Sequence, residues 1–276
     1  MKVKEVLSKN NSSDISEIIE YDKKERIVEF VLGMTKEQLI LNLDLELSDE
    51  QVSTIEKFFY EISQGKPLQY ITHKQYFYKS EFYVDERVLI PQPDTEVLVE
   101  KAIEILRGKA DCKVLDLCTG SGAIAISIKK ELPNVKMYAS DISKSALEVA
   151  KINSENILGK DKIIFIESDL FDNIENEDIK LNEFDLIVSN PPYIKKSVIK
   201  ELDKEVQSEP IIALDGGEDG LDFYRKIANI AEEKKIKHML LEIGYDQGKD
   251  ILDIFKNATI YKDYAGNDRV VECRKD

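Results

Sequence analysis

The segment KVLDLCTGSG, residues 113–122, decides the fold of this chain. Its first half, Lys113–Leu117, is an apolar run that predicts a buried strand, and a helix is expected directly afterwards over Gly122–Lys130. Glycines at such a junction let the backbone turn sharply and approach a ligand closely. The three-glycine dinucleotide fingerprint is incomplete and no lysine follows, so the loop taken alone also fits a tight turn between a strand and a helix.

The chain beyond this segment repeats the same alternation of apolar strands and helices. Repeated strand–helix–strand order implies an α/β domain, with a parallel sheet covered by helices on both faces. Only residues 262–268 separate the last two predicted strands, which is too short for a crossover helix, so these two should pair antiparallel. The predicted strands are Val135–Ser140, Ile163–Ile166, Phe184–Ser189, His238–Ile243, Thr259–Tyr261 and Arg269–Cys273, and the predicted helices are Ser143–Asn156, Leu221–Glu233 and Asp246–Phe255.

The residues before this domain predict helices and a hairpin. Ser48 and Gln51 form a capping box at the start of a helix that runs to about Ser63. An earlier helical stretch, ending at Gly33, carries the apolar residues Ile15, Ile18, Ile19, Ile27, Val28 and Val31. Residues 75–90 are rich in aromatic and β-branched residues, which is typical of a β-hairpin, here turning near Lys79. The expected domains are therefore a helical domain over 1–74, a hairpin linker over 75–90 and a sheet domain over 91–276.

Composition and charge narrow the classes of function. The 276 residues suffice for two domains, and 39 Lys and Arg against 54 Asp and Glu give a net charge of −15. This charge argues against tight binding of duplex nucleic acid, which needs cationic side chains. Three cysteines without C-x-x-C spacing and two histidines favour a reduced compartment and no metal site. No run approaches the ~20 apolar residues of a membrane span, so a soluble, cytoplasmic protein is expected.

Acidic residues follow the next two predicted strands. Asp141 ends the second strand, where an acidic residue can accept hydrogen bonds from both ribose hydroxyls of an adenosine ligand, although a helix N-cap is the alternative. At the end of the third strand, Asp169 can accept the adenine amino proton and Leu170 can pack on the ring. Ligands of open α/β sheets bind outside the carboxyl ends of the strands, so the three loops together favour a nucleotide-like site.

The fourth strand ends in Asn190-Pro191-Pro192-Tyr193, the most specific motif in the chain. The prolines stiffen the loop and keep Asn190 extended. The side-chain carbonyl of Asn190 and the main-chain carbonyl of Pro191 can then converge on one –NH2 group, against which Tyr193 can stack. An Asn-Pro turn without a chemical role is the structural alternative.

Together these motifs resemble the class I S-adenosylmethionine methyltransferases that modify amino nitrogens, among them N6-adenine DNA methyltransferases and protein glutamine methyltransferases. Further segments resemble the release factor glutamine methyltransferases, the HemK/PrmC family, over roughly residues 65–276. These segments are Gly65–Ile71, Leu89–Glu96, Glu209–Pro210, Ala213–Leu221 and Asp263–Val270.

The resemblance implies a Rossmann-like, mostly parallel seven-stranded sheet with an antiparallel final strand, preceded by a small helical domain that recognises the substrate. It implies methyl transfer from S-adenosylmethionine, which leaves S-adenosylhomocysteine, to the glutamine side-chain amide of the Gly-Gly-Gln motif of release factors. The cofactor-binding residues would be Cys118, Thr119, Gly120, Ser121, Gly122, Asp141, Asp169, Leu170 and Asn190, and the catalytic residues Asn190, Pro191, Pro192 and Tyr193.

Departures from the family pattern and rival functions remain. Gln92 stands where the family usually has Arg, Cys118 replaces a usual glycine, and His73 replaces a small residue. Gln92 cannot supply the bidentate fork of Arg, which affects affinity more than reaction type. The alternatives are glutamine methylation of a ribosomal protein, N6-adenine methylation of nucleic acid, and a non-catalytic module that binds adenosine-type ligands.

Overall fold

The computed structural model describes all residues except 9–18, 161, 176–178 and 276, so the helical positions predicted for Ile15 and Ile18 lie outside the described residues. The chain forms two compact units. Unit 1 contains Met1–His73 and Leu202–Ser208, and unit 2 contains Lys74–Glu201 and Glu209–Asp276.

Unit 1 is helical. Its helices are α1 (Val3–Ser8), α2 (Tyr21–Leu32), α3 (Lys36–Leu41), α4 (Asp49–Ser63), α5 (Leu68–Thr72) and α9 (Lys204–Gln207). The predicted capping box is confirmed, because Ser48 and Gln51 exchange both hydrogen bonds at the start of α4. Gly33 ends α2 in the left-handed conformation that favours glycine. The apolar residues Ile27, Val28 and Ile55 of these helices are fully buried in the core of this unit.

A short segment from much later in the sequence, residues 202–208, completes unit 1. Gly65 has φ +97°, and a Cβ atom there would lie 2.5 Å from the Cβ of Lys204. The Ser208 hydroxyl donates to the carbonyl of Gly65 (2.9 Å), and Lys23 pairs with Glu205. The close approach at position 65 therefore requires glycine, and it seats α9 against the helical unit.

Unit 2 is built on a seven-stranded sheet with the order β5-β4-β3-β6-β7-β9-β8. All neighbouring pairs are parallel except those that β9 makes with β7 and β8, which confirms the predicted parallel sheet with an antiparallel end. The strands are β3 (Lys113–Leu117), β4 (Lys136–Asp141), β5 (Ile163–Glu167), β6 (Leu186–Ser189), β7 (His238–Glu242), β8 (Thr259–Lys262) and β9 (Asp268–Arg274).

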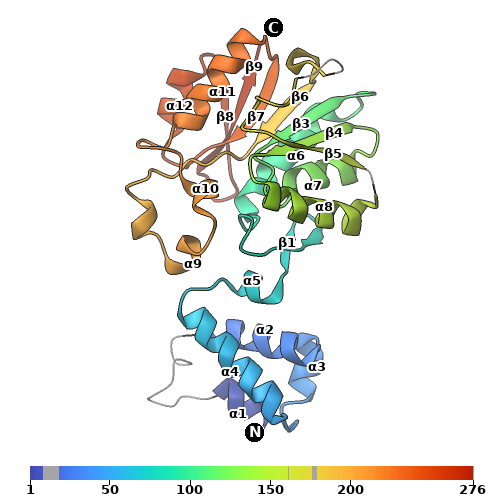
Figure 1. Cartoon of the computed structure of the whole chain (residues 1–276), viewed down its shortest axis with the longest axis vertical. Helices are drawn as coiled ribbons and strands as arrows, with labels where there is room; N and C mark the ends of the chain where they lie inside the picture. Colours follow the sequence, from blue (N-terminus) through green and yellow to red (C-terminus); the bar gives the residue numbers. More distant parts are fainter. Residues whose placement is uncertain (9–18, 161, 176–178, 276) are drawn as a thin grey trace. The chain divides into compact units, whose positions relative to one another are not determined.

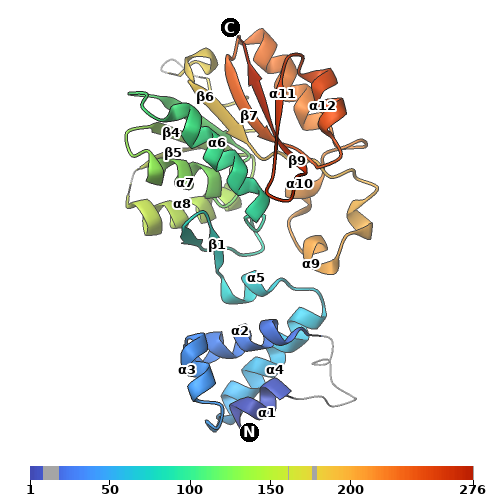
Figure 2. The same cartoon turned by 180° about the vertical axis from the view of Figure 1, so that it is seen from behind.

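Helices cover both faces of this sheet (Figures 1 and 2). Along β3, Val114 packs into one apolar cluster and its neighbours Leu115 and Leu117 into another, as the period of two in a strand requires. The first cluster includes α6 (Glu96–Leu106) and α7 (Ala123–Glu131), and the second includes α11 (Asp222–Glu233) and α12 (Gly248–Ile254). The remaining helices of the unit are α8 (Lys144–Leu158), which follows β4, and the short α10 (Ile211–Leu214).

Helix α6 was not predicted from the sequence. Its buried residues recur at helical spacing, as Leu98, Ala102 and Leu106 show, and Glu100 and Glu104 are exposed on the other side. The first of the two apolar clusters contains these buried residues together with Phe77 and Phe82 of the hairpin. The one-sided pattern was therefore present in the sequence, although the helix was not predicted from it.

The hairpin is shorter than predicted and belongs to unit 2. It consists of β1 (Gln75–Phe77) and β2 (Ser80–Phe82), and its turn residues Tyr78 and Lys79 have positive φ. Residues 83–90 form no strand. The segment predicted as a linker is therefore partly a structural element of the sheet unit, because Phe77 and Phe82 are fully buried. In the described part of the chain, no helix combines the length and apolarity needed to cross a membrane.

Candidate functional site

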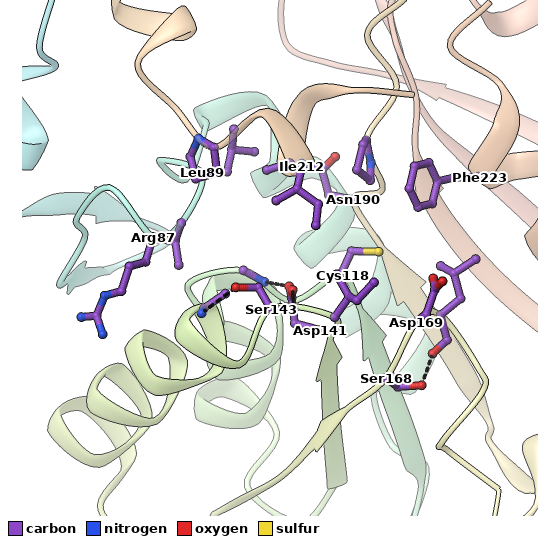
Figure 3. A pocket seen from close by; sticks show the side chains of 18 of the residues that line it. Arg87, Leu89, Cys118, Asp141, Ser143, Ser168, Asp169, Asn190, Ile212 and Phe223 are labelled. Carbon is purple, nitrogen blue, oxygen red and sulfur yellow. Dashed lines mark hydrogen bonds between the residues drawn. The ribbon is translucent and has the colours of Figure 1, made fainter. Parts of the chain in front are cut away.

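A cavity lies at the carboxyl ends of the central strands of unit 2. The sheet order reverses between β3 and β6, and this is the position where open α/β sheets bind ligands. The cavity encloses about 860 Å³ of empty space, including the part open to solvent, which suits a ligand of nucleoside size. Figure 3 shows Cys118, Asp141 and Asp169 on one side and Leu89, Ile212, Asn190 and Phe223 on the other.

The loop after β3 owes its shape to left-handed backbone positions. Cys118, Gly120 and Gly122 have φ of 57°, 54° and 82°. Cys118 adopts this conformation without being glycine, at the position where the family usually has one. The Thr119 hydroxyl donates to Asp116 Oδ2 (2.6 Å), which also accepts from the main-chain N–H of Ala125 (3.1 Å). Asp116 thus links the loop after β3 to the start of α7 through these two hydrogen bonds.

Asp116 itself is completely buried. Its Oδ1 atom has no hydrogen-bond partner among the described residues, and burial raises the pKa of this carboxyl to about 7. Asp116 does not line the cavity, so its role is to hold the loop after β3 and not to contact a ligand.

Asp141 follows β4 and lines the cavity. Its Oδ2 accepts from the N–H of Gly120 and its Oδ1 from the N–H of Ser143, both at 2.9 Å. The N-cap of α8 is Ser143, whose hydroxyl accepts from Ala146, so the alternative that Asp141 is the cap is wrong. Burial raises the pKa of Asp141. Each carboxylate oxygen has two lone-pair directions, so Asp141 can still accept hydroxyl hydrogens from a ligand.

The loop after β5 brings Asp169 and Leu170 to the same cavity. Leu170 has φ 46°. The Ser168 hydroxyl donates to the carbonyl of Leu170 (3.0 Å) and accepts from the N–H of Asn173 (2.9 Å), which holds this turn. An apolar side chain and a carboxylate therefore stand side by side at the position predicted for an adenine ring.

Asn190 and Pro192, which follow β6, also line the cavity. The Asn190 side-chain N–H donates to the Thr95 hydroxyl oxygen (3.3 Å). Tyr193 does not line the cavity. Its hydroxyl donates to Glu242 Oε1 (3.4 Å), and its ring packs against the cluster that includes Tyr224. The stacking of Tyr193 against a substrate amide stays a prediction.

Residues that the sequence did not single out individually hold this loop in place. The N–H of Ile194 donates to Leu214, and the N–H of Gly216 donates to Ile194 (both 2.9 Å). A Cβ atom on Gly216 would lie 2.7 Å from the Cα of Tyr193. Gln247 donates to the carbonyl of Tyr193 (3.1 Å) from the start of α12. The Asp-Gly-Gly part of the Ala213–Leu221 motif was the available signal, and close backbone packing is its physical reason.

The structure places the predicted site residues in two groups. Seven of them line the cavity: Cys118, Gly120, Asp141, Asp169, Leu170, Asn190 and Pro192. Thr119, Ser121, Gly122, Pro191 and Tyr193 lie in the same loops and shape them without lining the cavity. Burial, with Asp141 nearby, raises the pKa of the Cys118 thiol, which disfavours the thiolate that a cysteine nucleophile needs.

Gln92, the departure noted in the sequence, does not line the cavity, and its amide donates to the carbonyl of Ile90 (3.0 Å). A cation nearby is Arg269, which pairs with Asp94 (3.1 Å) and Asp263 (3.2 Å). The described residues contain no group of three or more His, Cys, Asp or Glu side chains placed to hold a metal ion.

Comparison with known proteins gives two family matches. Residues 93–209 match the model of the methyltransferase small domain, and residues 20–72 match the PrmC N-terminal domain. The chain is 37% identical to the release factor glutamine methyltransferase of Clostridium acetobutylicum, over 98% of both chains. It is 40% identical to the protein of the same name from Fusobacterium nucleatum, over 91% of this chain and 72% of that one.

Among solved structures, the fold is similar to that of the hMettl16 catalytic domain in complex with MAT2A 3'UTR hairpin 6. The TM-score is 0.55 at 16% identity, over 69% of this chain and 73% of that chain. At this identity the likeness concerns the fold alone. It establishes the class I methyltransferase architecture of unit 2 and says nothing about the substrate.

Proposed function

Because this chain belongs to the release factor glutamine methyltransferase family, we propose that the cavity of unit 2 methylates the side-chain amide of the glutamine in the Gly-Gly-Gln motif of a peptide-chain release factor. The chain is an S-adenosylmethionine-dependent protein glutamine methyltransferase. The proposal also includes the individual site residues and the motif that is modified. It further includes a substrate-recognition role for the helical domain and a cytoplasmic location.

The residues at the cavity fit the cofactor. Gly120 borders the cavity, and a Cβ atom there would meet no atom within 4 Å, so the loop leaves room for a ligand close to the main chain. Asp141 would accept hydrogen bonds from the ribose hydroxyls and Asp169 from the adenine amino group, and Leu170 would offer an apolar surface for the ring. When bound, S-adenosylmethionine supplies an electrophilic methyl group.

An amide nitrogen is a poor nucleophile because its lone pair is delocalised into the carbonyl. The protein must therefore hold the glutamine amide in line with the methyl group, which is a task of orientation. The side-chain oxygen of Asn190 and the main-chain oxygen of Pro191 would each accept a hydrogen bond from one N–H group of the substrate amide. These bonds would stabilise the positive charge that develops on the amide nitrogen. The extra proton then leaves to solvent.

One observation carries this proposal. Asn190, which bears one of the two acceptors, and Pro192, which follows the other, border the same cavity as Gly120 after β3 and Asp141 after β4. A methyl donor held by the β3 and β4 loops thus lies next to the group that would hold an amide. We call the side-chain oxygen of Asn190 and the main-chain oxygen of Pro191 the amide clamp. A module that only binds adenosine would need no such pair of acceptors.

Two variants separate the role of Asn190 in methyl transfer from the role of Asp141 in cofactor binding. Asn190→Ala should lower kcat by about 100-fold or more, because an oriented acceptor is lost, while the Kd for S-adenosylmethionine stays within about threefold. Asp141→Ala should raise that Kd by about tenfold or more, because hydrogen bonds to a charged acceptor are lost. Calorimetric titration and initial rates with a release factor measure both. Normal turnover by Asn190→Ala would refute the clamp, and normal cofactor affinity of Asp141→Ala would refute the ribose contact.

The adenine alternative uses the same acceptor pair on another –NH2 group. The net charge of −15 and the PrmC N-terminal domain over residues 20–72 both favour the protein substrate. Against glutamine methylation of a ribosomal protein stands only the similarity to relatives that are named release factor glutamine methyltransferases. Offering release factor, ribosomal protein and DNA to the enzyme in parallel separates these substrates.

A further inference from the structure

We propose that Asn153 of α8 is a positioning residue for the cofactor, because it ties the loop after β3 to a segment that lines another side of the cavity. The inference rests on the proposed function, since it assumes that S-adenosylmethionine binds at this loop. The segment consists of residues 83–90, which follow the hairpin, and we call it the wall segment. Figure 3 shows its residue Leu89 across the cavity from Asp141. The residues of the wall segment that line the cavity are Arg87, Val88 and Leu89.

The Asn153 side chain forms three hydrogen bonds with main-chain atoms of two segments that are far apart in the sequence. Its Oδ1 accepts from the N–H of Tyr83 (2.7 Å), and its Nδ2 donates to the carbonyl of the same residue (2.9 Å). The Nδ2 atom also donates to the carbonyl of Ser121 (2.9 Å), which lies in the loop after β3. Asn153 is 1% exposed, so water does not compete for these bonds. One side-chain amide therefore joins the wall segment to that loop.

This set of bonds requires an amide at position 153. The NH2 group gives both of its hydrogens to main-chain carbonyls, and the side-chain oxygen supplies the acceptor. A carboxylate of the same shape would place an oxygen against the carbonyls of Tyr83 and Ser121. An apolar side chain would leave all three main-chain groups without this partner, and buried polar groups without partners are costly. Asn153 thus holds both segments at one fixed spacing.

The loop after β3 contacts α8 at two adjacent points. Besides the bond from Asn153 to Ser121, Gly122 packs against Ala150, because a Cβ atom on Gly122 would lie 3.2 Å from the Cβ of Ala150. Ala150 and Asn153 are three positions apart and therefore lie on the same face of the helix. Gly120, which lines the cavity, directly precedes Ser121. The main chain that borders the cavity at Gly120 is therefore placed by α8.

The wall segment has internal bonds and a second connection to α8. The Tyr83 hydroxyl donates to Asp85 Oδ2 (2.9 Å), and the Arg87 guanidinium donates to the same oxygen (2.6 Å). Arg87 also pairs with Glu148 of α8 (3.2 Å), whose side chain is 55% exposed. An ion pair this exposed contributes little. The buried bonds of Asn153 are therefore the stronger of these two connections between the wall segment and α8.

A change at position 153 should act on cofactor binding more than on methyl transfer. The N–H of Gly120 donates to Asp141 (2.9 Å), so a shift of the loop after β3 disturbs the carboxylate proposed for the ribose as well. The amide clamp belongs to a different loop, which follows β6. Loss of binding that is equal in the ground state and the transition state raises KM and leaves kcat unchanged. A role in stability alone would lower the unfolding temperature without changing the KM of the folded enzyme.

The test uses Asn153→Asp, which keeps the shape of the side chain and removes both donors. The Kd and KM for S-adenosylmethionine should rise by about tenfold or more, with kcat at saturating cofactor within about threefold of wild type. The matched control is Asn156→Asp, which adds the same charge at an exposed position of α8 and should leave the Kd within about twofold. Calorimetric titration and initial rates with a release factor measure these values.

Thermal unfolding shows whether each variant is folded, and Asn153→Ala replaces Asn153→Asp if the latter is not. An unchanged Kd in the folded variant, or an equal rise with Asn156→Asp, would overturn the inference. A loss of kcat larger than the rise in KM would also overturn it, because the variant would then act on methyl transfer. Asp141→Ala in the same titration keeps the two proposals distinguishable. Weaker binding by Asp141→Ala beside normal binding by Asn153→Asp would refute the role of Asn153 alone, and normal binding by Asp141→Ala would refute the ribose contact.

Discussion

Glu209 carries a buried carboxyl that ties stability to pH. Its Oε2 accepts from the N–H of Ile90 (2.8 Å), and burial raises its pKa to about 7. The folded state thus holds this proton more tightly than the unfolded chain, where the pKa of glutamate is about 4.3. The higher pKa in the folded state stabilises that state while the Glu209 carboxyl is protonated. This stabilisation is complete below about pH 4 and is lost as pH rises through about 7.

Glu209→Gln keeps an acceptor for Ile90 and removes the titration. The variant should therefore gain stability over wild type as pH rises, by up to about 3 kcal/mol above pH 7, and the difference should shrink toward pH 4. Urea unfolding across this range measures it. Glu218→Gln, at an exposed position, is the control that should leave the profile unchanged. A constant difference between Glu209→Gln and wild type at every pH would contradict the assignment.

Individual site residues could be predicted where the sequence places them directly after a strand. Asp141, Asp169 and Asn190 all follow apolar runs, and the cavity collects them as expected. Thr95 was not found as the partner of Asn190, because the contact joins residues 95 positions apart in the chain. The stacking of Tyr193 on the substrate amide stays a prediction, and the hydrogen bond from its hydroxyl to Glu242 was not foreseen.

The turn from β3 into α7 depends on the close packing of Gly122. Its φ is +82°, and a Cβ atom there would lie 2.9 Å from Ile126 Cδ1 and 3.2 Å from the Cβ of Ala150. Gly108 in the same unit has φ +79°, and a Cβ atom there would meet nothing within 4 Å. Both glycines relieve backbone strain, but only Gly122 also avoids a clash.

Gly122→Ala should therefore destabilise the protein more than Gly108→Ala. Each substitution costs about 1 kcal/mol of left-handed strain, and the clash adds about 1–3 kcal/mol at Gly122 alone. Urea unfolding midpoints of the two variants give the comparison. Equal midpoints would mean that helix packing at the turn is looser than the structure indicates.

At the level of elements, runs that are buried on both faces were the easiest to predict. The prediction for β3 matches its bounds, and β4 is displaced from its prediction by one residue at both ends; β5, which is only partly buried, is one residue longer than predicted. Helix α4 was found through its capping box. Helix α6 was missed although its buried residues recur at helical spacing, and most of residues 75–90 form no strand because the hairpin ends at Phe82.

For the molecule as a whole, the sequence predicted two domains but could not show that Leu202–Ser208 belongs to the helical unit. That return depends on Gly65 meeting Lys204, a contact between residues far apart in the chain. Nothing in the local pattern of residues 202–208 distinguishes them from a loop of the sheet domain. The overall charge, in contrast, is fixed by composition alone.

The net charge of −15 predicts that the enzyme does not methylate duplex DNA. With labelled S-adenosylmethionine, DNA should take up no more label than it does with Asn190→Ala, even at low salt, where electrostatic binding is strongest. Release factor in the same buffer is the positive control. Label on adenine that depends on Asn190 would show that the acceptor pair serves the nucleic-acid reaction after all.

Methylation of the glutamine amide of Gly-Gly-Gln in a release factor can be measured by peptide mapping with mass spectrometry, after incubation of a release factor with S-adenosylmethionine and the enzyme. We expect one methyl group on the side-chain nitrogen of that glutamine, absent with Asn190→Ala and absent when the substrate glutamine is replaced by glutamate. A methyl group elsewhere in the release factor, or an unmodified Gly-Gly-Gln peptide beside an active enzyme, would contradict it.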